Sequence, residues 1–440
     1  MNRYYLAVPA LATAIAIAAR PHAPAEDVAL TNVTLIDGTG AAPQRNRTIV
    51  IKSGKISEIF ETGKKSPGDV KVIDLNGRYV IPGLIDAHVH VATDPTGRDA
   101  NAIDQLRSAF RGGVTSVRDM AGDAIALHDI AEEGNRDDTS LPRVVYSAVF
   151  AGPEFFKDPR TKSSAHGGTP GKVAWMRAIT DTTDLPRAVA DAKATGARAI
   201  KVYADLPPAL VRSIAAEAHK QGMKVWGHAA IYPARPSDAV NGGVDVVSHS
   251  LMLYWEAAAT MPPAYHNRPS SSAYDSLTGT SPEIKALFQN MLKRGTILDA
   301  TLFVSSRMEG VPAGTAGMAD PRRAVASAYE LTAAAREAGI PIAAGTDGMV
   351  GGSLADLPNI HREMQLMVEK SHFTPMQAIT AATLTSARAA GLDGTVGSVV
   401  AGKTADLVIL SADPTADISN TGKIEYVVKA GHIYSPGDIH

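Results

Sequence analysis

The chain has 440 residues, of which 45% are hydrophobic and 20% charged. This composition is typical of a globular protein that can hold several small domains or one large barrel with an appendage. A formal net charge of −2 gives no electrostatic reason to expect binding to nucleic acid or to an anionic membrane. The absence of cysteine excludes disulfides and thiolate ligands. Histidine, carboxylates and, less commonly, a modified lysine remain as metal ligands.

Residues 1–25 have the layout of a secretory signal peptide. Arg3 precedes an apolar, alanine-rich run from Leu6 to Ala19, and small residues follow at Ala23 and Ala25. The run is short for a membrane span, and no other stretch is long and apolar enough for one. We therefore expect a periplasmic or secreted protein without a membrane anchor. The alternative is an N-terminal extension on a cytoplasmic protein.

Short β runs separated by turn residues occupy two terminal regions, residues 26–80 and 395–440. In the first region, Thr48–Lys52 precedes a Ser-Gly turn, and in the second we expect strands at Gly397–Val400 and Ile424–Lys429. Short strands this close together are typical of an antiparallel module. The two regions flank a different middle, so we predict one small β-sandwich domain built from both chain ends.

The middle of the chain, residues 81–394, alternates apolar β runs with helical segments. Helices are expected, for example, at Ala209–Gln221 and Arg322–Ala338, each followed by glycine. Eight such units predict an α/β fold, a TIM-like (β/α)8 barrel whose active groups lie at the carboxyl ends of the strands. The predicted strands are the run that ends near His88, then Val114–Asp119, Arg143–Ala148, Ala199–Tyr203, Lys224–His228, Val244–His249, Thr296–Ala300 and Pro341–Asp347.

Three long inserts interrupt the barrel at Ala151–Asp184, Ser250–Ser281 and Met349–Pro358. Long loops in a compact barrel are usually lids over the site or disordered, and we favour lids. Tyr254 and Trp255 in the second insert could belong to a lid or to an interface between copies in a homo-oligomer. The oligomeric state cannot be predicted from the sequence.

The first barrel strand carries two histidines, His88 and His90, near its end. Side chains two positions apart on a strand point the same way, so the two imidazoles can bind one ion from one side. Four more candidate ligands lie at the ends of other predicted strands: Lys201, His228, His249 and Asp347. In a closed barrel these ends meet at one mouth, which predicts a metal site there.

Lys201 needs its own explanation, because a cationic ammonium would repel a divalent metal. It fits the site only with a lowered pKa, or after reaction with carbon dioxide to give a carbamate. Taken singly, a lysine after an apolar run is usually at the surface, and a histidine at a strand end is usually structural. Taken together, the six residues fall on five predicted strand ends, and this coincidence supports the metal site.

These motifs resemble the amidohydrolase superfamily, whose metal-dependent (β/α)8 barrel carries a small β-sandwich made from both termini. The similarity covers nearly the whole chain after the predicted signal. Within the superfamily, the chain is most similar to the branch of imidazolonepropionase-like proteins and metal-dependent Xaa-Pro and Xaa-Arg dipeptidases (prolidases). The motifs are Pro82–His90, Gly345–Asp347 and Gly397–Val408, and for the branch Val117–Asp119, Lys201 and His361–Glu363.

The resemblance implies two divalent metal ions, with zinc expected and Mn²⁺ or Co²⁺ as alternatives. His88, His90 and Asp347 would hold one ion, His228 and His249 the other, and carboxylated Lys201 would bridge them. A hydroxide between the metals would attack an amide carbonyl, and Asp347 would move the proton to the leaving amine. The implied substrate is a small exocyclic amide: a non-classical peptide, an N-acyl amino acid or an aryl amide.

The chain departs from its relatives where they bind substrate. Many relatives carry His or Tyr two residues after the fifth-strand histidine, where this chain has Ala230, which weakens the case for a plain dipeptide. Candidate substrate-binding residues are instead Tyr203, Tyr232, Arg235 and Arg118, although a structural ion pair is the simpler explanation for Arg118. His166, in an Ala-His-Gly-Gly segment, is a candidate catalytic group that contacts substrate or polarises the carbonyl.

Three other functions are open to such a site. The same hydroxide could open a cyclic amide of the imidazolone or hydantoin type, or cleave a carbamate or an ester. A deaminase is disfavoured, because superfamily deaminases carry Glu where this chain has Ile231. A metal-free, inactive scaffold is disfavoured because no ligand is missing.

Overall fold

The computed structural model describes residues 25–93, 99–266, 268–348 and 356–439. The predicted signal, residues 1–25, lies outside this range except for Ala25, and so does most of the glycine-rich insert that begins at Met349. Within the described residues, no helix is long and apolar enough to cross a membrane.

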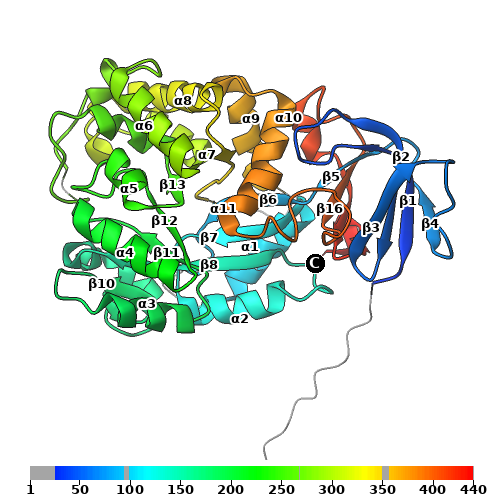
Figure 1. The fold of residues 1–440 in the computed structure, drawn as a ribbon, viewed down its shortest axis with the longest axis horizontal. Coiled ribbons are helices and arrows are strands. Elements are labelled where there is room, and N and C mark those ends of the chain that lie inside the picture. Colours follow the sequence, from blue (N-terminus) through cyan, green and yellow to red (C-terminus); the bar gives the residue numbers. More distant parts are fainter. Residues whose placement is uncertain (1–24, 94–98, 267, 349–355, 440) are drawn as a thin grey trace, which may run out of the picture.

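Strands from both chain ends form one eight-stranded sheet at one side of the molecule, blue and red in Figure 1. β5 lies at the junction, because it pairs with β1 on one side and with β16 on the other. Apolar side chains such as Val28, Leu30, Leu407 and Val428 form its buried core. The strands are β1 (Val28–Leu35), β2 (Gln44–Lys52), β3 (Lys55–Glu61), β4 (Lys71–Asp74), β5 (Tyr79–Pro82), β16 (Leu407–Leu410), β17 (Ile424–Lys429) and β18 (His432–Tyr434).

Eight parallel strands form the barrel, each paired with the next in chain order. The strands are β6 (Leu84–Val89), β7 (Val114–Asp119), β8 (Arg143–Ala151), β11 (Ala199–Val202), β12 (Lys224–His228), β13 (Val246–Ser248), β14 (Ile297–Asp299) and β15 (Ile342–Ala343). A short hairpin, β9 (Lys172–Val173) and β10 (Met176–Ala178), pairs through β10 alongside the end of β8. The predicted TIM-like barrel with a small domain from both chain ends is confirmed.

Helices surround the barrel (Figure 1), and proline occupies the first turn of many of them, where its missing N–H costs no hydrogen bond. They are α1 (Asp99–Arg111), α2 (Ala124–Gly134), α3 (Leu185–Ala194), α4 (Pro208–Lys220), α5 (Pro236–Gly242), α6 (Pro282–Arg294), α7 (Leu302–Ser306), α8 (Pro321–Glu337), α9 (Ile360–Ser371), α10 (Pro375–Thr380) and α11 (Ser386–Ala390). Among the 3₁₀ helices, η1 (Pro153–Lys157), η2 (Pro159–Ala165) and η3 (Ser250–Ala257) lie in the first two inserts.

The barrel closes between its last and first strands, next to the predicted ligands. Ala87 N donates to Ala344 O at 2.9 Å, and Asp347 N donates to His88 O at 2.8 Å. The buried Asp86 carboxylate strengthens this seam, because it accepts from the Thr346 hydroxyl at 2.7 Å and from the Thr346 N–H at 3.0 Å. The seam therefore holds the strand end that carries His88 against the segment that carries Asp347.

One predicted strand is absent. Gly397–Val400 is a bend in which Gly397 has a φ of +84°, and a Cβ there would lie 2.5 Å from the Ala387 side chain. Val399 N still donates to Asp37 O at 2.9 Å. Val399 is buried in the core of the small sheet, whereas Val400 is exposed. The strand interpretation was wrong.

Polar side chains join the small sheet to the barrel. Lys429, at the end of β17, is fully buried, and its ammonium donates to Gly134 O and Leu141 O, both at 2.7 Å. Arg143, at the start of β8, donates to Asp406 at 3.0 Å. The small sheet is thereby attached to the amino-terminal side of the barrel strands, away from the predicted site.

Candidate metal centre

His88, His90 and Asp347 form a compact group at the barrel mouth, with one ligand atom of each within 4.8 Å of the others. The Nδ1 atom of His88 lies 2.7 Å from Asp299, and that of His90 lies 2.9 Å from the carbonyl of Ala121. Both partners are acceptors, so each Nδ1 carries a proton, and each Nε2 is the atom left to face a ligand. Nε2 has a lone pair when its ring is neutral and a proton when the ring is charged. The two Nε2 atoms face Asp347 Oδ1, at 3.6 and 3.1 Å.

Asp347 is an anion held between the two imidazoles. It follows β15 with a φ of +52°, an unusual backbone conformation for a residue other than glycine. Burial would raise the pKa of its carboxyl, but His88 and His90 outweigh burial and hold the pKa well below its usual range. The carboxylate is therefore ionised at any physiological pH.

His249 extends the group toward the neighbouring strands. It follows β13 and its ring lies 5.0 Å from that of His88 and 4.8 Å from that of His228, between ring centroids. Its Nδ1 atom lies 2.9 Å from the Thr301 hydroxyl, which leaves Nε2 free to act as a ligand. Burial lowers the pKa of His249 to about 3 and that of His88 to about 4. Both rings are therefore neutral at pH 7, the form that binds metals.

His228 and Lys201 complete the set predicted from sequence. Both are buried at the ends of adjacent strands, and neither His228 Nδ1 nor Lys201 Nζ has a hydrogen-bond partner among the described residues. Buried polar atoms are normally paired, so these two are positioned as ligands for something else. Burial and the Arg118 charge lower the pKa of Lys201 to about 7, which makes a neutral amine accessible at physiological pH.

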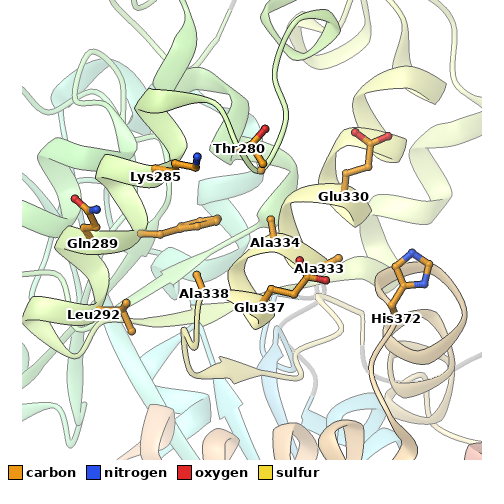
Figure 2. A pocket seen from close by; sticks show the side chains of 12 residues that line it. Thr280, Lys285, Gln289, Leu292, Glu330, Ala333, Ala334, Glu337, Ala338 and His372 are labelled. Atoms are coloured by element: carbon orange, nitrogen blue, oxygen red, sulfur yellow. The ribbon is translucent and has the colours of Figure 1, made fainter.

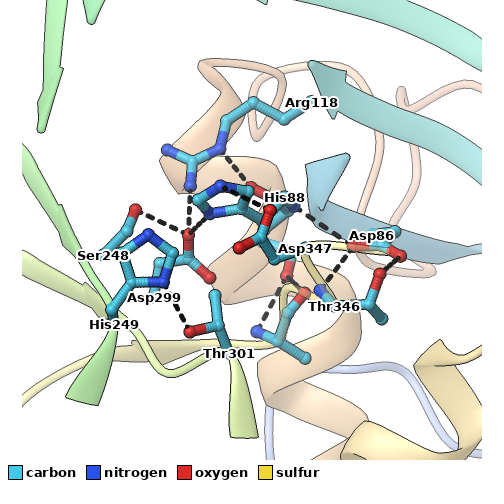
Figure 3. Close-up of polar contacts among 12 residues, drawn as sticks. Asp86, His88, Arg118, Ser248, His249, Asp299, Thr301, Thr346 and Asp347 are labelled. Atoms are coloured by element: carbon cyan, nitrogen blue, oxygen red, sulfur yellow. Dashed lines mark hydrogen bonds and ion pairs between the residues drawn. The ribbon is translucent and has the colours of Figure 1, made fainter. Parts of the chain in front are cut away.

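Asp299, at the end of β14, is a further candidate site residue that was not predicted from the sequence. Its Oδ2 atom accepts from His88 Nδ1 at 2.7 Å, from Arg118 Nη2 at 2.8 Å and from the Ser248 hydroxyl at 2.8 Å (Figure 3). Burial would raise the pKa of Asp299, but His88 and Arg118 outweigh it and lower the pKa. Asp299 thus orients His88. The available signal was weak: Asp299 is the penultimate residue of the predicted strand Thr296–Ala300.

Two of the predicted substrate-binding residues are fully buried. Arg118 lies behind His88, where it bonds Asp299 and the carbonyl of Ala87 and lies over the Trp226 ring (Figure 3). Tyr232 has no exposed surface and packs edge-on against Trp255. Neither side chain has exposed surface in this structure, and the contacts of both are structural. A role for either in substrate binding stays a prediction.

The remaining predicted residues lie at the rim or beside the histidines. Arg235 donates to the backbone carbonyls of Glu256 and Ala258, at 3.0 and 2.7 Å, and so holds the second insert in place. His166 is exposed and its Nδ1 atom lies 2.6 Å from Asp123 at the start of α2. Tyr203 lies directly against the His228 ring, with centroids 4.2 Å apart. Of the four predicted substrate-binding residues, Tyr203 is the one in contact with a candidate ligand.

A surface hollow of about 610 Å³ lies apart from this site, between α6 and α8 (Figure 2). Its lining includes Lys285, Phe288, Glu330 and His372. None of the six candidate ligands lines it, so it is not part of the metal centre.

Comparison with known protein families identifies the family of this chain. The model of the Amidohydrolase family matches residues 79–434 of the chain, which include both the barrel and the return to the small sheet. The chain belongs to the amidohydrolase family. Like other members of this family, it is a hydrolase that acts on carbon–nitrogen bonds.

Individual members of the amidohydrolase family are similar over most of their length. An enamidase of Eubacterium barkeri is 25% identical over 372 residues, which cover 82% of this chain and 81% of the enamidase. The structure of a Xaa-Pro dipeptidase with methionine in its active site has a TM-score of 0.71 at 22% identity, over 93% of this chain and all of that one. The ochratoxinase of A. niger has a TM-score of 0.71 at 20% identity, over 94% and 96% of the two chains. These two structures share the fold.

Proposed function

We propose that this amidohydrolase binds two divalent metal ions and cleaves an exocyclic amide bond of a small molecule. The observation that carries the proposal is the meeting of His88, His90 and Asp347 at the mouth, with the rings of His249 and His228 in contact beside them. Neutral imidazoles and a carboxylate are the ligand set that zinc prefers.

The side chains present fit a pair of ions. His88, His90 and Asp347 would hold the first, and His249 and His228 the second. Lys201, as a carbamate, would serve both. A buried ammonium without a partner is costly, and carboxylation would turn Lys201 Nζ into part of an anionic ligand. When bound, two divalent ions supply Lewis acidity, which lowers the pKa of water and polarises a carbonyl.

The chain's own residues would then position the reactants and move the proton. Asp347 is ionised, so one of its carboxylate oxygens can take the proton of the attacking water as the new C–O bond forms. The same carboxyl gives this proton to the amide nitrogen as the C–N bond breaks, which releases a carboxylic acid and an amine. Asp299 keeps His88 in the tautomer and orientation that leave Nε2 free.

The test is a metal analysis combined with a substrate screen. We expect about two zinc ions per chain, and hydrolysis of exocyclic amides in a panel of N-acyl amino acids, Xaa-Pro and Xaa-Arg dipeptides, aryl amides and hydantoins. Chelation should abolish the activity, and Zn²⁺ should restore it. Near-zero metal with no restored activity would identify an inactive scaffold, and turnover of hydantoins alone would identify a ring-opening enzyme.

A pair of histidine variants makes the metal assignment specific. His228→Asn should lower the zinc content from about two to about one ion per chain. His361→Asn is the matched control, because His361 is also buried but lies outside the site, against Gly112 and Thr421. Equal zinc content in both variants would remove His228 from the ligand set.

We also propose that the chain is exported and that residues 1–25 are removed. The apolar run from Leu6 to Ala19 and the small residues after it support this proposal. N-terminal sequencing of protein recovered from its native cells should find a chain that begins near Glu26. An intact Met1 would overturn the proposal.

A further inference from the structure

Four aromatic rings form a cluster beside the metal centre, which we call the aromatic wall: Phe155, Tyr203, Tyr265 and His266. Phe155 comes from η1 after β8, Tyr203 follows β11, and the other two come from the insert after β13. Ring centroids of Phe155 and Tyr203 are 4.3 Å apart, those of Tyr203 and Tyr265 5.8 Å, and those of Phe155 and His266 6.3 Å. Three segments far apart in sequence thus contribute to one apolar surface.

The aromatic wall lies directly beside the candidate ligand His228. The Tyr203 ring meets the His228 ring edge-on at 4.2 Å, and the Tyr265 ring is nearly parallel to it at 5.8 Å, with 22° between the planes. Phe155 is buried behind these rings, whereas Tyr203 and Tyr265 are only partly buried and keep some exposed surface. A substrate whose amide reaches His228 would therefore have its adjoining group against Tyr203 and Tyr265.

Hydrogen bonds and ring contacts fix the aromatic wall in place. The Asp205 carboxylate accepts from the Tyr265 N–H at 2.6 Å, and the Arg268 guanidinium lies 4.6 Å from the Tyr265 ring and 4.8 Å from the Tyr232 ring. At Gly152, before η1, a Cβ would lie 2.0 Å from the Asp205 carbonyl oxygen, so only glycine lets these loops come together. A surface held this way needs little reorganisation when a ligand binds.

Most nitrogen donors of the cations near the aromatic wall already have partners, which leaves few of them for a carboxylate. Arg160 donates to Asp158 through Nε at 2.9 Å and Nη2 at 2.6 Å, and His266 lies 3.2 Å from the same carboxylate. Arg268 donates to the carbonyls of Tyr265 and Ala316 and lies over two tyrosine rings, whereas its Nε is buried without a hydrogen-bond partner among the described residues. In addition, Ala230, two residues after His228, is fully buried and its methyl group offers no hydrogen bond to a carboxylate. The surroundings therefore favour an uncharged group.

We propose that the aromatic wall is a substrate subsite that selects amides bearing an uncharged aromatic group next to the scissile bond. This inference rests on the proposed function and narrows its substrate class. Ring faces and edges attract another ring beyond simple apolar burial. Exclusion of water from such a site makes a small acyl group or a charged dipeptide a poorer substrate by about 10–100-fold.

The experiment compares substrates that differ only in one group. N-benzoyl and N-acetyl amides of one amine, and the anilide and methylamide of one acid, are assayed with the zinc-loaded protein. We expect kcat/KM to be about 10-fold or more higher for the aromatic member of at least one pair. Equal kcat/KM within both pairs would overturn the subsite while leaving the proposed function intact.

Variants then locate the preference on the aromatic wall. Tyr265→Leu and Tyr203→Leu should each reduce the preference about 10-fold, mainly through KM, with unchanged zinc content, and Tyr265→Phe should retain it. Tyr426→Leu, on the exposed side of β17, is the matched control. An unchanged preference in both leucine variants would overturn the subsite. Loss of zinc in these variants would also overturn it, because the rings would then serve only to support His228.

A binding measurement keeps the two proposals separable. Acetophenone and acetone carry no C–N bond, so saturation-transfer NMR reports their binding whether or not the protein is an amidase. Stronger binding of acetophenone that is lost in Tyr265→Leu would support the subsite even if every amide in the panel resisted hydrolysis. Equal signals from both ketones would contradict it.

Discussion

Asp347 has two proposed roles, as a metal ligand and as the carrier of the proton. Asp347→Asn keeps the size of the side chain but removes its basicity. We expect turnover to fall by about 10²–10⁴-fold. The melting temperature and circular dichroism should stay close to those of the wild type, since backbone contacts such as Asp347 N to His88 O are kept. Retained turnover would remove Asp347 from the mechanism.

Asp299 supports the site without facing the substrate. Asp299→Asn weakens the bond to His88 Nδ1 and leaves the buried Arg118 without its counter-charge. We expect zinc affinity to fall by about 10–100-fold, measured by competition with a chelator. Ser248→Ala is the comparison, because it removes another donor to the same carboxylate but leaves His88 bonded. An affinity equal in the two variants would contradict the orienting role.

The six candidate ligands could be predicted from sequence because each lies at or near the end of an apolar run. Strand geometry then brings such positions together without further information. Asp299 has the same kind of position, but an acidic residue after a strand is common and nothing local distinguished it. Tyr265 lies within an irregular insert, and its place is set by the Asp205 carboxylate, 60 positions away in sequence. No local pattern could have predicted that contact.

At the scale of elements, the closure of the barrel depends on one small residue. A Cβ at Gly345 would lie 2.3 Å from Asp299 Oδ1 and 2.6 Å from the His88 Cβ, so β15 could not approach β6 with any larger side chain. Gly345→Ala should therefore displace both residues and lower zinc affinity and the melting temperature together. Gly310→Ala is the control, because nothing lies within 4 Å of a Cβ there. Normal zinc binding in Gly345→Ala would contradict this prediction, because it would show that β15 and β6 can move apart without disturbing the ligands.

The order of strands and helices could be predicted because apolar runs, prolines and terminal glycines carry local information. The predicted helix Ala209–Gln221 differs from α4 by one residue at each end. The strand predicted at Gly397–Val400 is absent because apolar residues there do not pair with a neighbouring strand. Val399 packs into the core of the small sheet, Val400 is exposed, and the left-handed backbone of Gly397 interrupts a strand. Periodicity predicts burial more directly than it predicts hydrogen bonding.

At the scale of the whole molecule, His361 links stability to pH. It lies between the barrel and the C-terminal segment, with Nε2 2.9 Å from the Gly112 carbonyl. Burial lowers its pKa to about 4, against about 6.5 in an unfolded chain. The unfolded state thus binds more protons between these values. The contribution of His361 is complete above about pH 6.5 and falls by about 3 kcal/mol as the pH drops to about 4.

His361→Gln should flatten this dependence. Urea unfolding at about pH 7.5 and about pH 5 should show a loss of stability smaller by about 2 kcal/mol in the variant than in the wild type. His128→Gln, at an exposed position on α2, should behave like the wild type. Identical losses in all three proteins would show that His361 does not carry the effect.

The buried ammonium of Lys429 has a consequence for how the protein is made. Gly134 and Leu141 are synthesised early, but their carbonyl oxygens can accept the hydrogen bonds from Lys429 only after β17 has been synthesised. One edge of β5 likewise stays unpaired until β16 has been synthesised. Until nearly the entire polypeptide has been synthesised, these groups can be satisfied only by solvent or by a chaperone. We therefore expect this junction to form only after residue 429 has been synthesised, so that a nascent chain stalled earlier stays sensitive to proteases there.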